Sequence, residues 1–399
     1  MPSLADRLQL PTAALFWGLQ FSFLSPSLGI LLAGLFGASA TQIGTVLMVY
    51  NLAGLACSLV IPTMADRHGD YLRPLGTCAL LTGSLAVALA LSGSLRVAVV
   101  ALVLLGAPAS VGGTLFFAHL RASGTGTRRM MDIRAIMSFA WVFGMPLATF
   151  VLGRFGPRGL LVSLALVAVM NIVNTLGLRR SHAAALARAE AAGRSRPRLV
   201  TVPASRRLLA VMVLVFVLLQ ATNVAAVTVT SLLVTERLEL RVFWAGTALG
   251  LSALLEIPAL MAVGRLAERY GNSALLFSGC LAAVGYYAAM SQAHLPWQLL
   301  VLQVLNAWAV AVVSGVGLTW FQESIARPGL ASAVFGNTRL VGAIVSGPLV
   351  AFGAATSLGY AGVFAAAAVV CAVVSAVVLL LWLVRSRRAG ARRAQSAAV

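Results

Sequence analysis

An internal repeat constrains this sequence more than any other feature. The second half of the 399-residue chain matches the first half after a shift of 202 positions. Gly44-Thr45 recurs as Gly246-Thr247, and Ala65-Asp66-Arg67-His68-Gly69 recurs as Ala267-Glu268-Arg269-Tyr270-Gly271. Both halves consist mainly of apolar runs. A duplicated helical membrane protein folds into two pseudo-symmetric halves whose interface can hold a substrate near the bilayer midplane, an architecture typical of carriers.

Composition places the chain in the membrane class. Hydrophobic residues make up 60% of it and charged residues 10%, and the mean hydropathy is +0.96, which is outside the soluble globular range. A spanning helix needs about 20 mostly apolar residues. Such runs lie near 12–35, 41–62, 73–93, 96–118, 134–153, 159–178, 208–233, 242–264, 273–292, 296–319, 331–353 and 359–384. We therefore expect an all-α fold with twelve transmembrane helices.

The arginines predict the orientation of these helices. All 29 basic residues are arginines, and with the N-terminus inside, 23 of them fall in cytoplasmic segments, five in external loops and Arg339 inside a span. Retention of positive charge on the inner side is the topology rule for such proteins. Arginine-only usage with abundant Ala and Gly indicates a GC-rich bacterial genome. We expect a monomer in the bacterial inner (plasma) membrane, with both termini cytoplasmic and no nucleic-acid partner.

The apolar pattern breaks once, over residues 179–207, which are rich in Ala, Arg, Pro and Ser. We interpret this segment as a cytoplasmic linker between a six-helix bundle at 1–178 and another at 208–384, with a tail at 385–399. The four cysteines lie inside predicted spans without CxxC spacing, so we expect no metal or cofactor. A membrane-embedded enzyme would need a metal-binding acid cluster or an activated nucleophile, and the sequence favours a non-enzymatic protein.

The two repeated loops carry a recognisable motif. Residues 62–73 and 264–271 resemble the cytoplasmic GxLADRxGRR signature of the major facilitator superfamily, although Pro62 stands where the family usually has glycine and Asp70 replaces a basic residue. An acid at a helix end can pair with arginine and with a neighbouring helix N-terminus. Such a cluster can latch the two halves in one state; the alternative is an ordinary solvated charge cluster. The predicted gating residues are Asp66, Arg67, Gly69, Glu268, Arg269, Gly271 and Arg134.

Four further stretches are similar to bacterial sugar efflux transporters of this superfamily. They are Ala140–Pro146, Leu255–Ala259, Leu302–Ala307 and Gly315–Gln322. The resemblance implies export of mono- or disaccharides and related glycosides, driven by the proton gradient. Some members have an acid in span seven, where this chain has Val227-Thr228-Val229-Thr230. The rival hypothesis is export of amphipathic drugs, since Gly144-x-Pro146 and Gly347-Pro348 loosely resemble the glycine-proline pattern of drug antiporters. A regulatory protein that has lost transport is a further alternative.

One acidic residue differs from the rest by its depth. Nine of the ten acids lie in loops or at helix ends, whereas Glu256 lies inside a span, about 12 Å from the cytoplasmic end at 1.5 Å per residue. A carboxylate in that position costs several kcal/mol unless it is protonated, paired or hydrated. Glu256 is therefore predicted to be the proton-coupling carboxylate or an acceptor for a sugar hydroxyl. The structural alternative is an ion pair with Arg339 in span eleven.

Polar side chains on the spans that usually line the cavity in this superfamily are candidate substrate ligands. Planar amides match sugar hydroxyls, and aromatic faces stack on the C–H surface of the ring. Two amide pairs are spaced i, i+3, so each pair shares one helix face; the alternative is interhelical hydrogen bonding, commonly worth about 1 kcal/mol in membranes. The predicted substrate-binding residues are Gln20, Gln220, Asn223, Gln303, Asn306 and Trp308.

Overall fold

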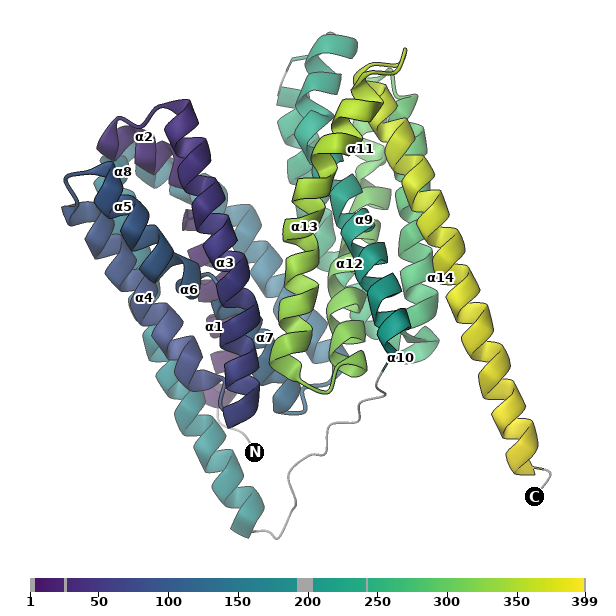
Figure 1. Cartoon of the computed structure of the whole chain (residues 1–399), viewed down its shortest axis with the longest axis horizontal. Coiled ribbons are helices and arrows are strands. Elements are labelled where there is room, and N and C mark those ends of the chain that lie inside the picture. Colours follow the sequence, from purple (N-terminus) through teal and green to yellow (C-terminus); the bar gives the residue numbers. More distant parts are fainter. Residues whose placement is uncertain (1–3, 25–26, 192–203, 242, 398–399) are drawn as a thin grey trace. The chain divides into compact units, whose positions relative to one another are not determined.

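The computed structural model describes residues 4–24, 27–191, 204–241 and 243–397 (Figure 1). Within these ranges the regular structure is entirely helical, as the composition predicted. The elements are α1 (Leu4–Leu24), α2 (Leu28–Phe36), α3 (Ala40–His68), α4 (Leu72–Leu91), α5 (Leu95–Ala101), η1 (Leu102–Gly106), α6 (Ala107–Ala109), α7 (Gly112–Ala122), α8 (Thr127–Ala191), α9 (Arg206–Leu232), η2 (Leu233–Arg237), α10 (Phe243–Ser291), α11 (Pro296–Val301), α12 (Gln303–Ser324), α13 (Pro328–Ala354) and α14 (Tyr360–Ala397).

The helices account for the predicted spans. In the described ranges, nine stretches are long and apolar enough to cross a membrane, and the bent pair α1–α2 adds a tenth. Two of the nine are far longer than one crossing: the α8 stretch has 62 residues and the α10 stretch 48, against about 20 for a bilayer. Each is broken by a glycine with non-helical torsions, Gly156 in α8 and Gly271 in α10. Divided there, α8 and α10 each contain two of the twelve predicted spans.

The repeated loops turn at equivalent glycines. Gly69 ends α3 with φ 64° and ψ 16°, and Gly271 breaks α10 with φ 78° and ψ 161°. Positive φ is costly for residues with a side chain, so glycine is favoured where either copy reverses direction. The internal repeat in the sequence is therefore matched by a repeated backbone feature.

The chain divides into two compact units. Unit 1 comprises residues 1–203 and 321–337, and unit 2 comprises residues 204–320 and 338–399. The predicted bundle boundaries at 178 and 208 stay predictions. Helix α8 continues through Ala191, into the predicted linker, while residues 192–203 of that linker lie outside the described part. Helix α14 likewise continues to Ala397, through most of the predicted tail.

Close packing inside unit 1 depends on small residues. A Cβ at Gly18 would lie 2.6 Å from the Cβ of Ala140, and one at Gly112 would overlap the buried ring of Trp17. Lipid tails are as apolar as leucine, so helices in a bilayer associate through such close contacts and not through a hydrophobic driving force. Helices α1, α7 and α8 are held together in this way.

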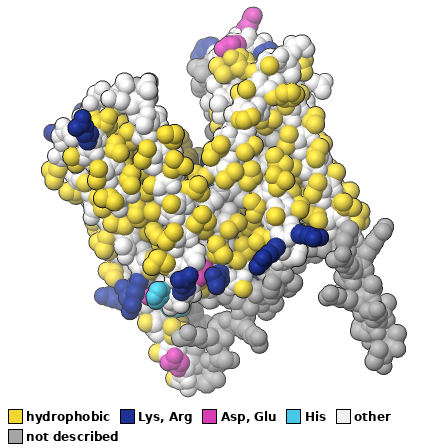
Figure 2. Space-filling model, in the orientation of Figure 1, with side chains coloured by type: hydrophobic (Ala, Val, Ile, Leu, Met, Phe, Trp, Pro, Cys, Tyr) yellow, Lys and Arg dark blue, Asp and Glu magenta, His cyan; other side chains and the backbone are white. Residues whose placement is uncertain are grey.

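The outer surface is apolar, as a bilayer requires. Leu91 is 80% exposed and Phe150 65% exposed in unit 1, and Ile344 and Phe352 are about equally exposed in unit 2. Figure 2 shows that the visible face of unit 1 is hydrophobic between two edges where arginine side chains gather. An apolar band bordered by charge is the surface expected of a membrane-spanning bundle.

Candidate functional site

The first copy of the loop motif forms a defined polar site inside unit 1. Asp66, near the end of α3, accepts hydrogen bonds from the backbone N–H groups of Gly329 (2.7 Å) and Leu330 (2.9 Å) at the start of α13. The hydroxyl of Tyr71 donates a third bond to the same carboxylate, at 2.7 Å. A helix N-terminus carries unsatisfied N–H groups and partial positive charge, so it binds a carboxylate well. Asp66 of the first repeat therefore caps a helix of the second repeat.

Glycine at position 329 makes this approach possible. A Cβ at Gly329 would overlap the carbonyl oxygen of Pro62 and lie 2.8 Å from Oδ1 of Asp66. Pro62 stands where the family signature usually has glycine, yet the helices still approach closely there. The small residue that permits the contact is on α13 instead of α3.

Tyr71 is suited to remain a donor to this carboxylate. It lies in the short connection between α3 and α4 and is 6% exposed. Burial, followed by the hydrogen bond to Asp66 and the charge of that carboxylate, raises the pKa of Tyr71 well above its ordinary value of 10.0. The phenol thus stays protonated throughout the physiological pH range.

Of the other predicted gating residues, Arg134 packs against aromatic rings, and the charged residues of the loops are exposed to solvent. In unit 1, Arg67 is exposed, whereas the Arg134 guanidinium lies 5.7 Å from the ring centroids of both Phe117 and Phe335. Cation–π contacts of this kind attract the guanidinium to the ring faces. The second motif copy, in unit 2, differs from the first. Glu268 and Arg269 are both exposed, and Arg269 lies over the ring of Tyr270 at 5.3 Å.

Three further hydrogen bonds in unit 1 involve residues that the sequence analysis did not name as site residues. The Ser58 hydroxyl donates to Oδ1 of Asn337 at 2.8 Å. The Gln322 amide donates to the Phe117 carbonyl at 3.2 Å and to the Ser332 hydroxyl at 2.9 Å. The available signal in the sequence was a polar residue near each end of segment 321–337, Gln322 and Asn337. Their partners could not be predicted, because Phe117 and Ser58 lie more than 200 residues away along the chain.

One predicted amide pair forms a buried network in unit 2. Gln303 and Asn306 lie on α12, 0% and 5% exposed. The Asn306 amide donates to Oε1 of Gln303 at 3.1 Å and to the hydroxyl of Ser252 on α10 at 2.9 Å. Gln303 in turn donates to the Leu299 carbonyl at 2.8 Å. The i, i+3 spacing does place both amides on one face, where they bind each other and a serine that the sequence analysis missed.

Glu256 continues the polar face of α10. It follows Ser252 by four residues, one helical turn, and its side chain is half-buried. The signal that could have revealed Ser252 is this i, i+4 spacing from the deep carboxylate. Arg339, on the part of α13 that belongs to unit 2, is exposed. The Glu256–Arg339 pairing stays a prediction.

The remaining predicted substrate ligands lie on three different helices. Gln220 and Asn223 are half-buried on α9. The Trp308 indole on α12 donates to the hydroxyl of Ser278 on α10 at 3.2 Å. In unit 1, the Gln20 oxygen accepts a bond of 2.9 Å from Asn171 of α8. The structure thus groups Gln303 with Asn306 and places Gln20 in the other unit.

Metal chemistry has no candidate centre in the described ranges, because no group of three or more His, Cys, Asp and Glu side chains there could hold an ion. The four cysteines are free thiols. The described residues form two separate polar clusters: a carboxylate-capped helix in unit 1, and in unit 2 two amides bonded to each other and to the Ser252 hydroxyl, with Glu256 one helical turn from that serine. Such groups bind and release polar molecules or protons through hydrogen bonds.

Comparison with known proteins assigns this architecture to a class. The sequence profile of the Major Facilitator Superfamily matches residues 12–346. Sugar efflux transporter A of Dickeya chrysanthemi is 28% identical over 355 residues, which cover 88% of this chain and 85% of that protein. A Deinococcus radiodurans protein provisionally named a sugar efflux transporter is 31% identical over 389 residues, 95% of this chain and 98% of that protein. The crystal structure of the transporter FucP in the outward conformation matches 93% of this chain and 97% of its own, with a TM-score of 0.70 and 13% identity.

Proposed function

Because the chain belongs to the major facilitator superfamily of multi-pass secondary transporters, we propose that it exports small sugars or related glycosides in exchange for protons. The observation that carries the choice of cargo is the similarity to proteins named sugar efflux transporters, which extends over most of both chains. Export proceeds by alternating access, with the substrate site exposed to one side of the membrane and then to the other. The N- and C-termini lie in the cytoplasm, and the working unit is the monomer.

Asp66 is the latch in this proposal. Its bonds to Gly329 and Leu330 connect a helix of the first repeat to a helix of the second. In one state of the cycle these bonds are made, and in the other they are released to water. A carboxylate on a helix N-terminus is strong enough to bias the equilibrium and weak enough to break, since such interactions contribute about 0.3–2 kcal/mol.

The sugar-binding groups are the amides of unit 2. Gln220 and Asn223 on α9 are half-buried and are the more accessible pair. Gln303 and Asn306 are buried, and they exchange their mutual bonds for bonds to sugar hydroxyls when cargo arrives. Trp308 supplies the aromatic face, and Gln20 supplies a further acceptor from the first repeat.

Glu256 carries the proton. Its position one turn from Ser252 places an ionisable group beside the amide network, so protonation and cargo binding affect the same hydrogen bonds. Arg339 stabilises the ionised form of the carboxylate during part of the cycle. An intramembrane acid is a functional residue by default because its burial is otherwise costly.

The experiment is counterflow in proteoliposomes with a panel of labelled mono- and disaccharides and, as the rival arm, amphipathic dyes. Proteoliposomes that contain the protein should accumulate at least one labelled sugar and none of the dyes. The rate of sugar uptake should change when the pH difference across the membrane is reversed. Asn223→Ala should lower the apparent sugar affinity, while Asn174→Ala should not, because this amide in unit 1 donates to the Met170 carbonyl of its own helix and accepts from the Thr12 hydroxyl of α1. Dye flux without sugar flux would favour the drug exporter.

A further inference from the structure

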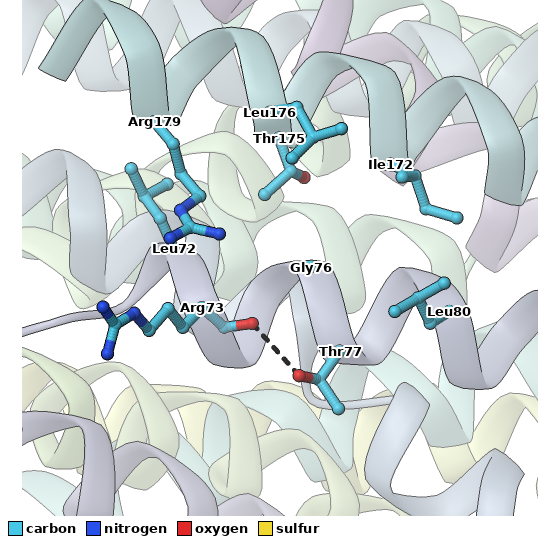
Figure 3. A pocket seen from close by; sticks show the side chains of 9 residues that line it. All are labelled: Leu72, Arg73, Gly76, Thr77, Leu80, Ile172, Thr175, Leu176 and Arg179. Carbon is cyan, nitrogen blue, oxygen red and sulfur yellow. Dashed lines mark hydrogen bonds between the residues drawn. The ribbon is translucent and has the colours of Figure 1, made fainter. Parts of the chain in front are cut away.

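Unit 1 has a groove on its surface that the transport proposal does not use. It lies between α4 and the last part of α8 and has a volume of about 270 Å³ (Figure 3). Figure 3 shows Arg73 and Arg179 at one end of the groove and Leu80 and Ile172 at the other. The groove is therefore charged at one end and apolar at the opposite end.

The register of the two helices explains this polarity. A Cβ at Gly76 would lie 3.6 Å from Cγ2 of Thr175, and one at Gly83 would lie 3.6 Å from the Cβ of Ala168. Seven residues forward on α4 thus correspond to seven residues backward on α8, so the helices are antiparallel. Arg73, near the start of α4, consequently lies at the same level of the helix pair as Arg179, near the end of the span in α8. The distance from either arginine to the apolar end is about 10 Å at 1.5 Å per residue.

Among the side chains that line the groove, Arg73 and Arg179 are the ones with hydrogen-bond donors available to a ligand. The Thr77 hydroxyl donates to the Arg73 carbonyl at 3.2 Å, and the Thr175 hydroxyl donates to the Asn171 carbonyl at 2.7 Å. Both hydroxyl protons are therefore committed within their own helices. The rest of the wall is formed by the side chains of Leu72, Leu80, Ile172 and Leu176. A ligand for this groove needs an anionic group and an adjoining hydrocarbon segment.

Arg73 keeps most of its donors for such a ligand. Its Nε lies 3.1 Å from Oδ2 of Asp70, and its side chain is 75% exposed. Oδ1 of Asp70 accepts the backbone N–H groups of Leu72 and Arg73, at 3.0 and 3.1 Å. A guanidinium has five N–H donors in a planar fork, so the terminal nitrogens of Arg73 stay available at the end of the groove that the exposed Arg179 also lines (Figure 3). Asp70 offsets part of the positive charge and should weaken anion binding.

We infer that this groove binds one membrane phospholipid with an anionic head group. The phosphate lies between Arg73 and Arg179, and the upper part of one acyl chain lies along Leu80, Leu176 and Ile172. Arginine forks match phosphate oxygens, and basic pockets between membrane helices are suited to anionic head groups. Leu80 is 57% exposed and Leu176 47% exposed, so the apolar part of the groove lies on the outer surface of two candidate spans, where lipid is the available ligand.

Native mass spectrometry of the purified full chain tests this inference. Phosphatidylglycerol and phosphatidylcholine with identical acyl chains are titrated separately, and glycerol phosphate serves as the head group without chains. The variants are Arg73→Gln/Arg179→Gln, Thr77→Trp to fill the groove, and Asp70→Asn. Arg96→Gln/Arg158→Gln is the matched control, because these arginines are also exposed but lie far along the chain from the groove. Unfolding temperature and elution volume verify that each variant is folded.

The intact chain should retain one phosphatidylglycerol in preference to phosphatidylcholine. Removing both groove arginines should weaken its affinity about thirtyfold, Thr77→Trp should weaken it too, and Asp70→Asn should strengthen it. The control pair should have no effect. Equal retention of the two lipids, or unchanged phosphatidylglycerol binding in the arginine or Thr77→Trp variants, would overturn the inference. So would equally tight binding of glycerol phosphate, which would indicate a phosphate site without a lipid chain.

Discussion

Asn306 illustrates how a buried amide is satisfied in this protein. Its two amide donors bind Ser252 on one helix and Gln303 on its own helix, and the side chain is 5% exposed. An unsatisfied polar group in an apolar interior costs about 1–3 kcal/mol. The network therefore has a structural role in addition to the binding role proposed for it.

Replacing the serine measures that structural role. Ser252→Ala should lower the free energy of unfolding by about 0.6 kcal/mol, and by no more than about 1.7, the range found for interhelical hydrogen bonds in membranes. Thermal unfolding in detergent is the measurement. Ser346→Ala is the control, since the Ser346 hydroxyl donates to Ala343 within its own helix and the side chain is also buried. Equal effects of the two substitutions would mean that the Asn306 bond contributes nothing.

Tyr71 gives a prediction with a defined pH window. Because its pKa is raised above 10.0 in the folded chain, the folded state favours the protonated phenol. The resulting stability is fully present below pH 10 and is lost as the pH rises above it, where the unfolded chain ionises first. The difference in unfolding temperature between the parent and Tyr71→Phe should be constant from pH 6 to 9 and should shrink above pH 10. Tyr270→Phe, at a 56% exposed position, is the matched control substitution.

At the scale of whole elements, the start of α13 is the contact most sensitive to size. Gly329→Ala should separate α13 from α3, because the added methyl overlaps the Pro62 carbonyl and crowds Asp66. We expect at least a tenfold loss of transport rate in proteoliposomes, with a lower unfolding temperature. Gly347→Ala on the same helix meets no atom within 4 Å and should be nearly silent. A fully active Gly329→Ala protein would exclude the latch.

The two repeat-related glycines should tolerate side chains differently. Gly69 has left-handed helical torsions, which asparagine also adopts, whereas the φ 78° and ψ 161° of Gly271 lie in a region that is almost exclusive to glycine. Gly69→Asn should therefore cost less than about 1 kcal/mol, and Gly271→Asn about 1–3 kcal/mol. Unfolding temperatures of the two variants give the comparison. The reverse order would show that the α10 break relaxes around a side chain.

The sequence predicted elements well and partners poorly. Apolar run length identified the spans because every crossing needs the same length of hydrocarbon-facing helix. Spacing placed Gln303 and Asn306 on one face, since i, i+3 neighbours share a face in any helix. The Ser252 and Gly329 contacts depend on how distant segments pack, which no local pattern encodes. The contact between α3 and α13 is an example: the glycine that permits it is Gly329 on α13, and not a residue at position 62 of α3, where the family signature usually has glycine.

At the scale of the whole molecule, the duplicated motif is used unequally. The acid of the first copy is bonded to three donors, whereas the acid of the second copy, Glu268, is exposed. The lone deep carboxylate, Glu256, also belongs to the second repeat. Sequence symmetry therefore supports a symmetric fold, while the charged groups that could drive a cycle are distributed asymmetrically between the repeats. We expect substitutions in the first repeat to affect gating most strongly, and substitutions in the second repeat to affect proton coupling most strongly.

Glu256→Gln separates coupling from binding. Glutamine keeps the shape and a hydrogen-bonding oxygen but carries no exchangeable acidic proton. If Glu256 couples transport, export driven by an imposed pH gradient should fall at least tenfold, while sugar counterflow, which needs no net proton movement, should continue. Glu190→Gln, at an exposed acid near the end of α8, should leave both modes intact. Loss of both gradient-driven export and counterflow would instead make Glu256 a cargo ligand or a structural partner. Full gradient-driven export by Glu256→Gln would remove Glu256 from the mechanism, because the site of proton exchange must then lie elsewhere in the chain.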